Sequence, residues 1–334
     1  MERRPLGDTG WNVTEVGLGT WNVGPSWGDV SDEQFREAVR AALEAGANVV
    51  DTADVYGGGR AERLIGEVLD EVDPDERVYV FTKAGQYFDE QAADRYTREN
   101  LESFVDDSRE RLGTDALDLL QLHCPPTETY YRPETFEALD ALVDAGKVRH
   151  YGVSVEKVEE ATKAVEYDGV KSVQIIFNPL RQRPAERFFE RAAREDVGVI
   201  VRVPLASGLL ADAFDADTEF GEDDHRGRAV REGVAAGVGP KGGETFAGAP
   251  FEAGLEVVEE LRPLVPGDAT MAQYTLRWIL DHDAVTTVIP GSTDPGHVRD
   301  NVAAADLDPL SHREHGAIRD AYEAHVRDHV HHRW

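Results

Sequence analysis

Four side chains in the first half of the chain are of the types that could transfer a proton to a carbonyl oxygen: Asp51, Tyr56, Lys83 and His123. Tyrosine ordinarily titrates near ~10, and a neighbouring cation lowers that pKa because it favours the phenolate. Lys83 would therefore bring the Tyr56 phenol toward working pH, where it can donate a proton to a developing alkoxide. General acid catalysis of this kind is typically worth ~10²–10⁴ in rate. Asp51 is the natural partner of Lys83, since either charge buried alone would be costly.

Each of these residues has a plainer explanation when it is taken alone. A strand-end aspartate often caps a helix, a lysine is usually solvated, a histidine can be a satisfied core residue, and Tyr56 could be a packing aromatic on a loop. Together, near the ends of successive apolar runs, they instead predict one site. The glycines at 57–59 turn the backbone sharply away after Tyr56, so that the phenol can lean over that site.

Other chemistries lack the residues they need in this pattern. The strand ends carry no His/Asp/Glu triad with metal spacing, so no metal is expected, and no serine lies in a nucleophile elbow. Cys124 directly follows His123, so on a strand the two side chains point to opposite faces and a Cys–His pair is not expected. His325 and His329 stand at i and i+4, a spacing that suits a metal, and the alternative is a solvated polar tail.

Short apolar runs recur along the chain, each followed by a loop and a helical pattern, which is typical of buried parallel strands. The eight runs cover 15–19, 48–53, 78–83, 117–123, 150–154, 172–178, 198–203 and 284–290. Helices are expected over 31–46, 61–72, 97–113, 132–147, 155–165, 185–196 and 271–281. This alternation predicts an α/β protein with a (β/α)8 TIM barrel, and the alternative is an open doubly wound sheet. The barrel is favoured because no glycine-rich dinucleotide fingerprint follows any strand.

The strand ends of such a barrel open on one face, where these enzymes keep their active sites. The polar residues in or at the ends of the predicted strands are Asp51, Lys83, His123, Ser154, Gln174 and Asn178. We therefore expect them to lie together.

Three further segments complete a single predicted domain over 1–334. The residues around 7–10 predict a β-hairpin that closes the barrel bottom, and the last twenty or so predict a C-terminal helix. The stretch 211–250 is rich in Gly, Asp and Ala and shows little periodicity. A segment of this length is expected to be either a functional lid or a mobile loop.

The charge balance excludes some classes of partner. The chain has 35 Lys and Arg against 65 Asp and Glu, a formal charge of −30, which disfavours binding to nucleic acid and to anionic membranes. At molar salt the Debye length falls to about 3 Å, so the composition suggests a halophilic microbe, and the alternative is a merely acidic mesophilic protein. The single cysteine, the absence of a long apolar run and the charged N-terminal residues predict a cytoplasmic protein.

The chain resembles the aldo-keto reductase superfamily over nearly its whole length. The segments that carry the resemblance are VGLGTW, DTADVYGGGRAERLIG, FTKAG, DLLQLHCPP, GKVRHYGVS, and IPGS followed by Asn301. The resemblance implies a barrel that binds NADP(H) across its C-terminal mouth and reduces an aldehyde or ketone, or oxidises the corresponding alcohol. It makes Tyr56 the proton donor, Lys83 with Asp51 its helpers, and His123 the residue that orients the carbonyl.

The resemblance also implies a set of cofactor contacts, with NADP(H) preferred and NAD(H) as the alternative. These contacts are Gly19, Thr20, Trp21, Ser154, Gln174, Arg202, Pro204, Leu205, Ser207, Leu209, Gly291, Ser292, Thr293, His297 and Asn301. Three positions depart from the family pattern. Val155 replaces an asparagine that contacts the nicotinamide amide, Arg202 replaces a stacking tyrosine and adds positive charge beside the nicotinamide, and His297 replaces an arginine of many NADPH-specific members.

Loop aromatics are expected to line the substrate pocket: Trp21, Trp27 and Tyr87. Their faces would suit a small aldehyde, a ketone or a sugar-like substrate. The stretch 211–250 falls where relatives carry a loop that closes over the cofactor. A function of another class, a cofactor-binding redox sensor or regulatory subunit with little turnover, is the alternative to the enzyme.

Overall fold

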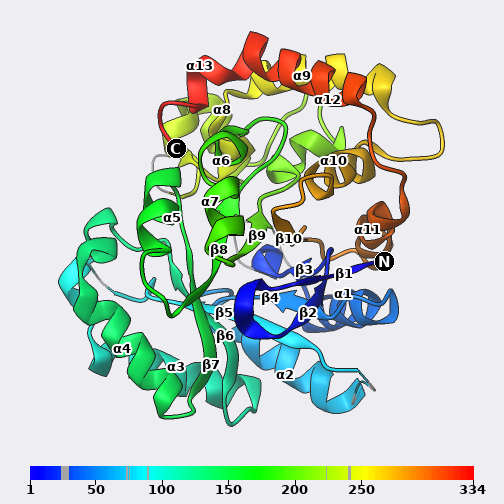
Figure 1. The fold of residues 1–334 in the computed structure, drawn as a ribbon. Coiled ribbons are helices and arrows are strands. Elements are labelled where there is room, and N and C mark those ends of the chain that lie inside the picture. Colours follow the sequence, from blue (N-terminus) through cyan, green and yellow to red (C-terminus); the bar gives the residue numbers. More distant parts are fainter. Residues whose placement is uncertain (24–29, 73, 75, 89, 223, 240–241) are drawn as a thin grey trace.

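Eight parallel strands form a closed barrel within the part of the chain that the structure describes, and the sequence prediction is confirmed (Figure 1). The structure, a computed structural model, describes all residues except 24–29, 73, 75, 89, 223 and 240–241. The barrel strands are β3 (Leu18–Gly19), β4 (Val49–Asp51), β5 (Tyr79–Ala84), β6 (Leu117–His123), β7 (Val148–Ser154), β8 (Val170–Ile176), β9 (Gly198–Arg202) and β10 (Val285–Val288). Each pairs with the next, and the bridges of Val16 with Val288 and Gly19 with Gly291 join the first strand to the last.

The register of these strands places the predicted site residues side by side. Lys83 lies opposite Gln121, and His123 lies opposite Ser154. Ser154 in turn lies opposite Gln174. The β5–β6 and β6–β7 pairs keep one register, and the register shift between β7 and β8 falls before Ser154, so the polar strand ends gather on one face.

The N-terminal hairpin closes the other end of the barrel, as predicted. Strands β1 (Arg3–Pro5) and β2 (Asn12–Thr14) pair antiparallel. Leu6 and Val13 of this hairpin are fully buried against interior residues of the barrel strands, such as Phe81 and Leu119. Burying these side chains at the bottom excludes water from the barrel interior, which leaves the opposite face as the accessible mouth.

The helices follow their strands and cover the outside of the barrel (Figure 1). They are α1 (Asp32–Glu44), α2 (Arg60–Val72), α3 (Arg98–Leu112), α4 (Pro133–Asp144), α5 (Val158–Ala164), α6 (Arg183–Arg187), α7 (Phe189–Arg194), α10 (Met271–Leu280) and α11 (Pro295–Ala303). Side-chain caps set several starts, because Ser31, Thr97 and Thr270 accept hydrogen bonds from backbone N–H groups of the first turn. The single helix predicted over 185–196 is instead α6 and α7, and α11 has no counterpart among the predicted helices.

The stretch 211–250 contains short helices in its described part and lies over the barrel mouth. It holds α8 (His225–Glu232) and the 3-10 turns Val234–Ala236 and Thr245–Gly248, and it leads into α9 (Phe251–Leu261). Phe214, Phe220 and Phe246 pack their rings against Phe251. This aromatic packing, which no local periodicity signals, joins the segment to the main hydrophobic core.

The C-terminal residues form a helical stretch with an irregular centre. It consists of α12 (His312–Ala321), a π-helical turn (Tyr322–Val326) and α13 (Arg327–Val330). This stretch lies beside α9 at the outer edge of the molecule, along the top of the view in Figure 1. One predicted helix is therefore found, but with a widened turn in the middle. Within the described residues, no helix is long and apolar enough to span a membrane.

Candidate active site

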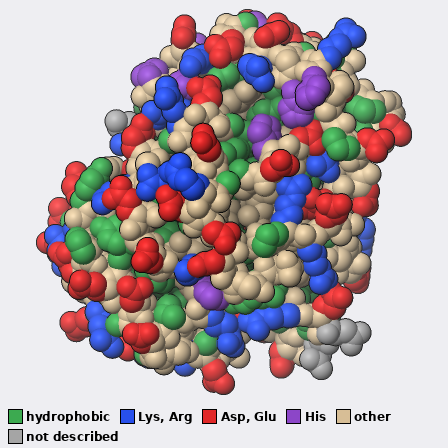
Figure 2. Space-filling model, in the orientation of Figure 1, with side chains coloured by type: hydrophobic (Ala, Val, Ile, Leu, Met, Phe, Trp, Pro, Cys, Tyr) green, Lys and Arg blue, Asp and Glu red, His purple; other side chains and the backbone are tan. Residues whose placement is uncertain are grey.

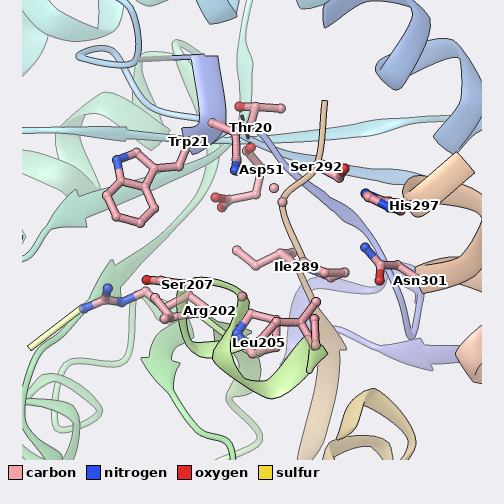
Figure 3. A pocket seen from close by; sticks show the side chains of 18 of the residues that line it. Thr20, Trp21, Asp51, Arg202, Leu205, Ser207, Ile289, Ser292, His297 and Asn301 are labelled. Atoms are coloured by element: carbon pink, nitrogen blue, oxygen red, sulfur yellow. Dashed lines mark hydrogen bonds between the residues drawn. The ribbon is translucent and has the colours of Figure 1, made fainter. Parts of the chain in front are cut away.

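A cavity of about 660 Å³ opens at the mouth of the barrel and contains most of the predicted site residues. In Figure 3, Trp21 and Arg202 lie toward one end of it and His297 and Asn301 toward the other. The predicted cofactor contacts that line it are Gly19, Thr20, Trp21, Ser154, Gln174, Arg202, Pro204, Leu205, Ser207, Gly291, Ser292, Thr293, His297 and Asn301. Asp51, Tyr56 and His123 line it as well. The strand ends thus meet in one elongated cavity.

Asp51 and Lys83 form the buried ion pair that the sequence predicts. Their side chains are 3% and 1% exposed, and Lys83 Nζ lies 2.5 Å from Asp51 Oδ1. Lys83 Nζ also donates to the backbone oxygen of Thr52 at 2.7 Å. The second carboxylate oxygen of Asp51 accepts a bond of 2.7 Å from the Gln174 side chain. Every charge of the pair is therefore matched, which such burial requires.

Tyr56 extends from the loop after β4 and lies against both Lys83 and His123. Lys83 Nζ is 5.1 Å from the centre of the phenol ring, and the His123 ring meets it edge-on with centroids 5.8 Å apart. The following residues, Gly57–Gly59, all have positive φ, between 59° and 86°. Glycine adopts this backbone without strain, so the chain can turn away directly after Tyr56.

The expected lowering of the Tyr56 pKa by Lys83 is wrong for this arrangement. Burial raises the pKa of Tyr56 well above its usual range, the charges of Asp51 and Glu244 raise it further, and Arg202 opposes them. The attraction of Lys83 for the phenolate is outweighed, because Asp51 offsets much of the Lys83 charge at 2.5 Å. The phenol is consequently held in its protonated, proton-donating form.

His123 is half-buried at the cavity, in surroundings that favour the neutral imidazole. Burial lowers the pKa of His123 well below its usual range, and the positive charges of Lys83 and Arg202 lower it further. Its Nδ1 atom has no hydrogen-bond partner among the described residues. A neutral imidazole whose ring faces the cavity can donate a hydrogen bond to an incoming oxygen without adding charge.

Arg202 lines the cavity, as expected, and its guanidinium lies in a cluster of charges. It is buried at the end of β9, and its guanidinium donates to Glu156 at 2.6 Å, to Glu244 at 2.5 Å and to the Val155 oxygen at 3.1 Å. Burial lowers the pKa of Arg202, but Cys124, Glu156 and Glu244 more than reverse this and hold it above its usual range. Its positive charge is therefore partly offset by two carboxylates at this end of the cavity.

Two other positions that were expected at the site, Leu209 and Tyr87, lie off the cavity. Leu209 is 1% exposed in the core and does not line the cavity. Tyr87 is 46% exposed, donates its hydroxyl to the Asp54 oxygen, and also lies off the cavity. The side chain of Val155 is fully buried in the core. Trp21 does line the cavity, whereas Trp27 falls outside the described residues.

Several residues at the site were not predicted from the sequence. Gln121 is fully buried and accepts from Gln174 at 3.1 Å, and its signal was present as a polar residue inside an apolar run. Arg226 and Glu244 reach the cavity from the 211–250 stretch. Neither stands in a recognisable local pattern, since only the tertiary fold brings that stretch over the mouth.

The described residues contain one trio whose donor atoms are close enough for a metal ion: Cys124, Glu156 and Glu244. The Arg202 guanidinium already contacts all three, so it takes the position of a cation. At the other candidate, both His325 ring nitrogens lie 2.8 Å from carboxylates of α9, Glu256 and Glu260. These contacts pack His325 against α9, whereas the alternative expected a solvated polar tail.

Comparison with known proteins gives a family and a set of relatives. The sequence model of the aldo/keto reductase family matches residues 15–323. The chain is 28% identical over 306 residues to the aldo-keto reductase YhdN of Bacillus subtilis (strain 168), covering 89% of this chain and 87% of the relative. It is 28% identical over 343 residues to the NADH-specific methylglyoxal reductase of Escherichia coli (strain K12), covering 97% and 99%. It is similar to the structure of the glycerol dehydrogenase AKR11B4 from Gluconobacter oxydans, with a TM-score of 0.79, 26% identity and coverage of 97% and 96%.

Proposed function

The chain belongs to the aldo/keto reductase family, and we propose that it transfers a hydride between NADP(H) and an aldehyde or ketone, or the corresponding alcohol, with Tyr56 as the general acid and base. The observation that carries the proposal is the meeting of Tyr56, neutral His123 and the buried Asp51–Lys83 pair at the floor of one elongated cavity. The names of the relatives favour this reading over the alternative of a sensor with little turnover.

The cavity has features that fit a dinucleotide. It continues from Tyr56 past Ser207 to Ser292, His297 and Asn301. The Ser207 hydroxyl is buried without a hydrogen-bond partner among the described residues, at a backbone turn with positive φ, and could donate to a phosphate. We propose NADP(H) as the preferred cofactor, with NAD(H) as the alternative that the E. coli relative's name supports. When bound, the nicotinamide supplies the hydride or accepts it.

In this proposal each catalytic side chain has a separate task. His123 donates a hydrogen bond to the substrate oxygen and orients it toward Tyr56. The Tyr56 phenol donates its proton to the oxygen as charge develops there, and in the reverse direction it accepts that proton. Asp51 holds Lys83 beside the phenol, where the ammonium stabilises the phenolate that forms after transfer. Trp21 lines the same cavity and supplies a flat apolar wall.

Turnover of a carbonyl panel by Tyr56→Phe tests the proposal. The panel contains sugars, 2-oxoaldehydes and aromatic aldehydes, each assayed in molar KCl with NADPH and with NADH. We expect the wild type to turn over at least one class and Tyr56→Phe to lose ~10²–10⁴ in kcat while still binding cofactor. Tyr131→Phe removes an exposed phenol that lies off the cavity and should keep wild-type kcat. Wild type and Tyr56→Phe that both bind cofactor and both reduce nothing in the panel would contradict the enzyme reading.

A further inference from the structure

Asp54 is a buried carboxyl group on the loop that carries Tyr56. It is fully buried, and neither of its side-chain oxygens has a hydrogen-bond partner among the described residues. Its backbone N–H donates to the Lys83 oxygen at 3.1 Å, and its own carbonyl accepts the Tyr87 hydroxyl at 3.1 Å. The backbone of Asp54 thus ties the Tyr56 loop to the end of β5, while its buried carboxyl group makes no hydrogen bond of normal geometry with the described residues.

The groups that face Asp54 leave no spare positive charge in the described part of the chain. Glu62 of α2, fully buried, accepts from Thr82 at 2.5 Å and from Arg111 of α3 at 2.6 Å. Arg111 is the cation that faces Asp54, and it is already paired with Glu62. The other titratable groups that face Asp54 are the phenols Tyr87 and Tyr96, which both follow β5.

The same arginine supports the loop that carries Tyr56. A side chain added at Gly59 would lie 2.6 Å from the Cδ atom of Arg111, so the Arg111 stem packs directly under the glycine run. Tyr56 stands between Asp54 and Gly59 in the sequence. Any displacement of Arg111 toward Asp54 would therefore disturb the turn that aims the phenol.

Burial of a lone carboxylate beside another carboxylate is unfavourable, so the protonated form of Asp54 is preferred. Burial raises the pKa of Asp54 to about 7, the charge of Glu62 raises it further, and the N–H groups of Val55 and Gly85 together with Arg111 oppose the rise. Near neutral pH the carboxyl group therefore changes its charge, at a position two residues from Tyr56.

We propose that Asp54 is a positioning residue for Tyr56 that works in its protonated form. Ionised Asp54 repels Glu62 and competes with it for Arg111, which shifts the packing under Gly59 and with it the Tyr56 phenol. Carbonyl reduction then falls when Asp54 loses its proton. This inference rests on the proposed function, because it concerns the aim of the same phenol.

The pH profile of kcat in the wild type and in Asp54→Asn tests the inference. Asparagine keeps the size of the side chain but cannot ionise. In the wild type, kcat for carbonyl reduction should follow the protonated fraction of Asp54. Above the transition near pH 7 it should therefore fall about tenfold per pH unit, toward a lower plateau. In Asp54→Asn this transition should be absent, with kcat at pH 6 and the Kd of NADPH close to wild type. Asp70→Asn, which removes an exposed carboxyl on α2, should keep the wild-type profile.

A second measurement does not depend on activity. An acid whose pKa is raised by folding binds its proton more tightly in the native state, so the stability it contributes is lost as pH rises toward the folded pKa. The Tm of Asp54→Asn should therefore exceed that of the wild type at pH 8, by more than it does at pH 5. Equal pH profiles or equal Tm values in the two proteins would overturn the role of Asp54. A protein that turns over no carbonyl at any pH would overturn the proposed function, and the Tm comparison would still decide whether Asp54 titrates.

Discussion

At the residue scale, the Asp51–Lys83 ion pair is costly to bury, and it also has a task in the proposed chemistry. Their pair is almost fully buried, and Gln174 and the Thr52 oxygen complete its hydrogen bonds. A buried pair of this kind contributes little net stability, but removal of one partner leaves an uncompensated charge. Because separating the pair costs free energy, the two side chains are held in place and the site is rigid.

Lys83→Met tests this view. It leaves the Asp51 carboxylate buried without its cation, so the free energy of unfolding should fall by about 3–5 kcal/mol. The double variant Lys83→Met with Asp51→Asn should recover much of that loss, because no charge remains to be buried. Urea unfolding followed by circular dichroism gives both values. A single variant as stable as the wild type, or a double variant less stable than the single one, would contradict the account.

The sequence contained enough information for the catalytic half of the site. Asp51, Lys83 and His123 are polar residues at the ends of apolar runs, and parallel strands gather such ends whatever the loops do. The charge environment could not be predicted in the same way. The effect of Lys83 on the pKa of Tyr56 depends on how completely Asp51 offsets the Lys83 charge. That offset is set by the distance between the two side chains and by their burial.

At the element scale, the 211–250 stretch is fixed over the mouth by buried arginines of the barrel. Arg202 reaches Glu244, 42 residues away in sequence, and Arg181 donates to the Gly243 oxygen at 2.9 Å. No spacing rule relates residues so far apart in the chain. The sequence alone therefore could not decide whether the segment is a lid or a mobile loop. The aromatic packing that leads into α9 was missed for the same reason.

Arg202→Met tests the attachment of this stretch. It leaves two carboxylates, Glu156 and Glu244, facing each other without a cation, so the stretch should detach from the barrel. We expect faster cleavage within 211–250 by a low dose of protease and a weaker affinity for NADPH. Glu222→Gln changes an exposed carboxylate of the same stretch and should alter neither. Unchanged cleavage and affinity in Arg202→Met would show that the ion cluster does not hold the segment.

At the scale of the whole molecule, the excess of acid is a property of the surface. Figure 2 shows carboxylates spread over the visible face among fewer basic side chains. Many of them form exposed ion pairs, such as Arg36 with Glu67 and Arg40 with Glu71, and such pairs are typically worth about 0–1 kcal/mol each. With a formal charge of −30, self-repulsion outweighs these pairs in dilute buffer.

The Tm should therefore rise as KCl is raised from low concentration to molar levels. Screening by salt weakens the repulsion among carboxylates more than it weakens the attraction within exposed ion pairs, because acids outnumber bases by 65 to 35. Calorimetry over a KCl series measures the effect, and sucrose, which stabilises by exclusion and does not screen charge, serves as the control. A Tm that is flat or falls with KCl would refute the halophilic interpretation of the composition.

We propose that hydride passes between a nicotinamide and a carbonyl carbon at the Tyr56 end of the cavity. The most direct measurement follows the label from NADPH deuterated at the nicotinamide C4 into the product by proton NMR. We expect an alcohol that carries deuterium on the former carbonyl carbon with the wild type, and almost no labelled product with Tyr56→Phe. An alcohol formed without that label, or labelled equally by both proteins, would contradict it.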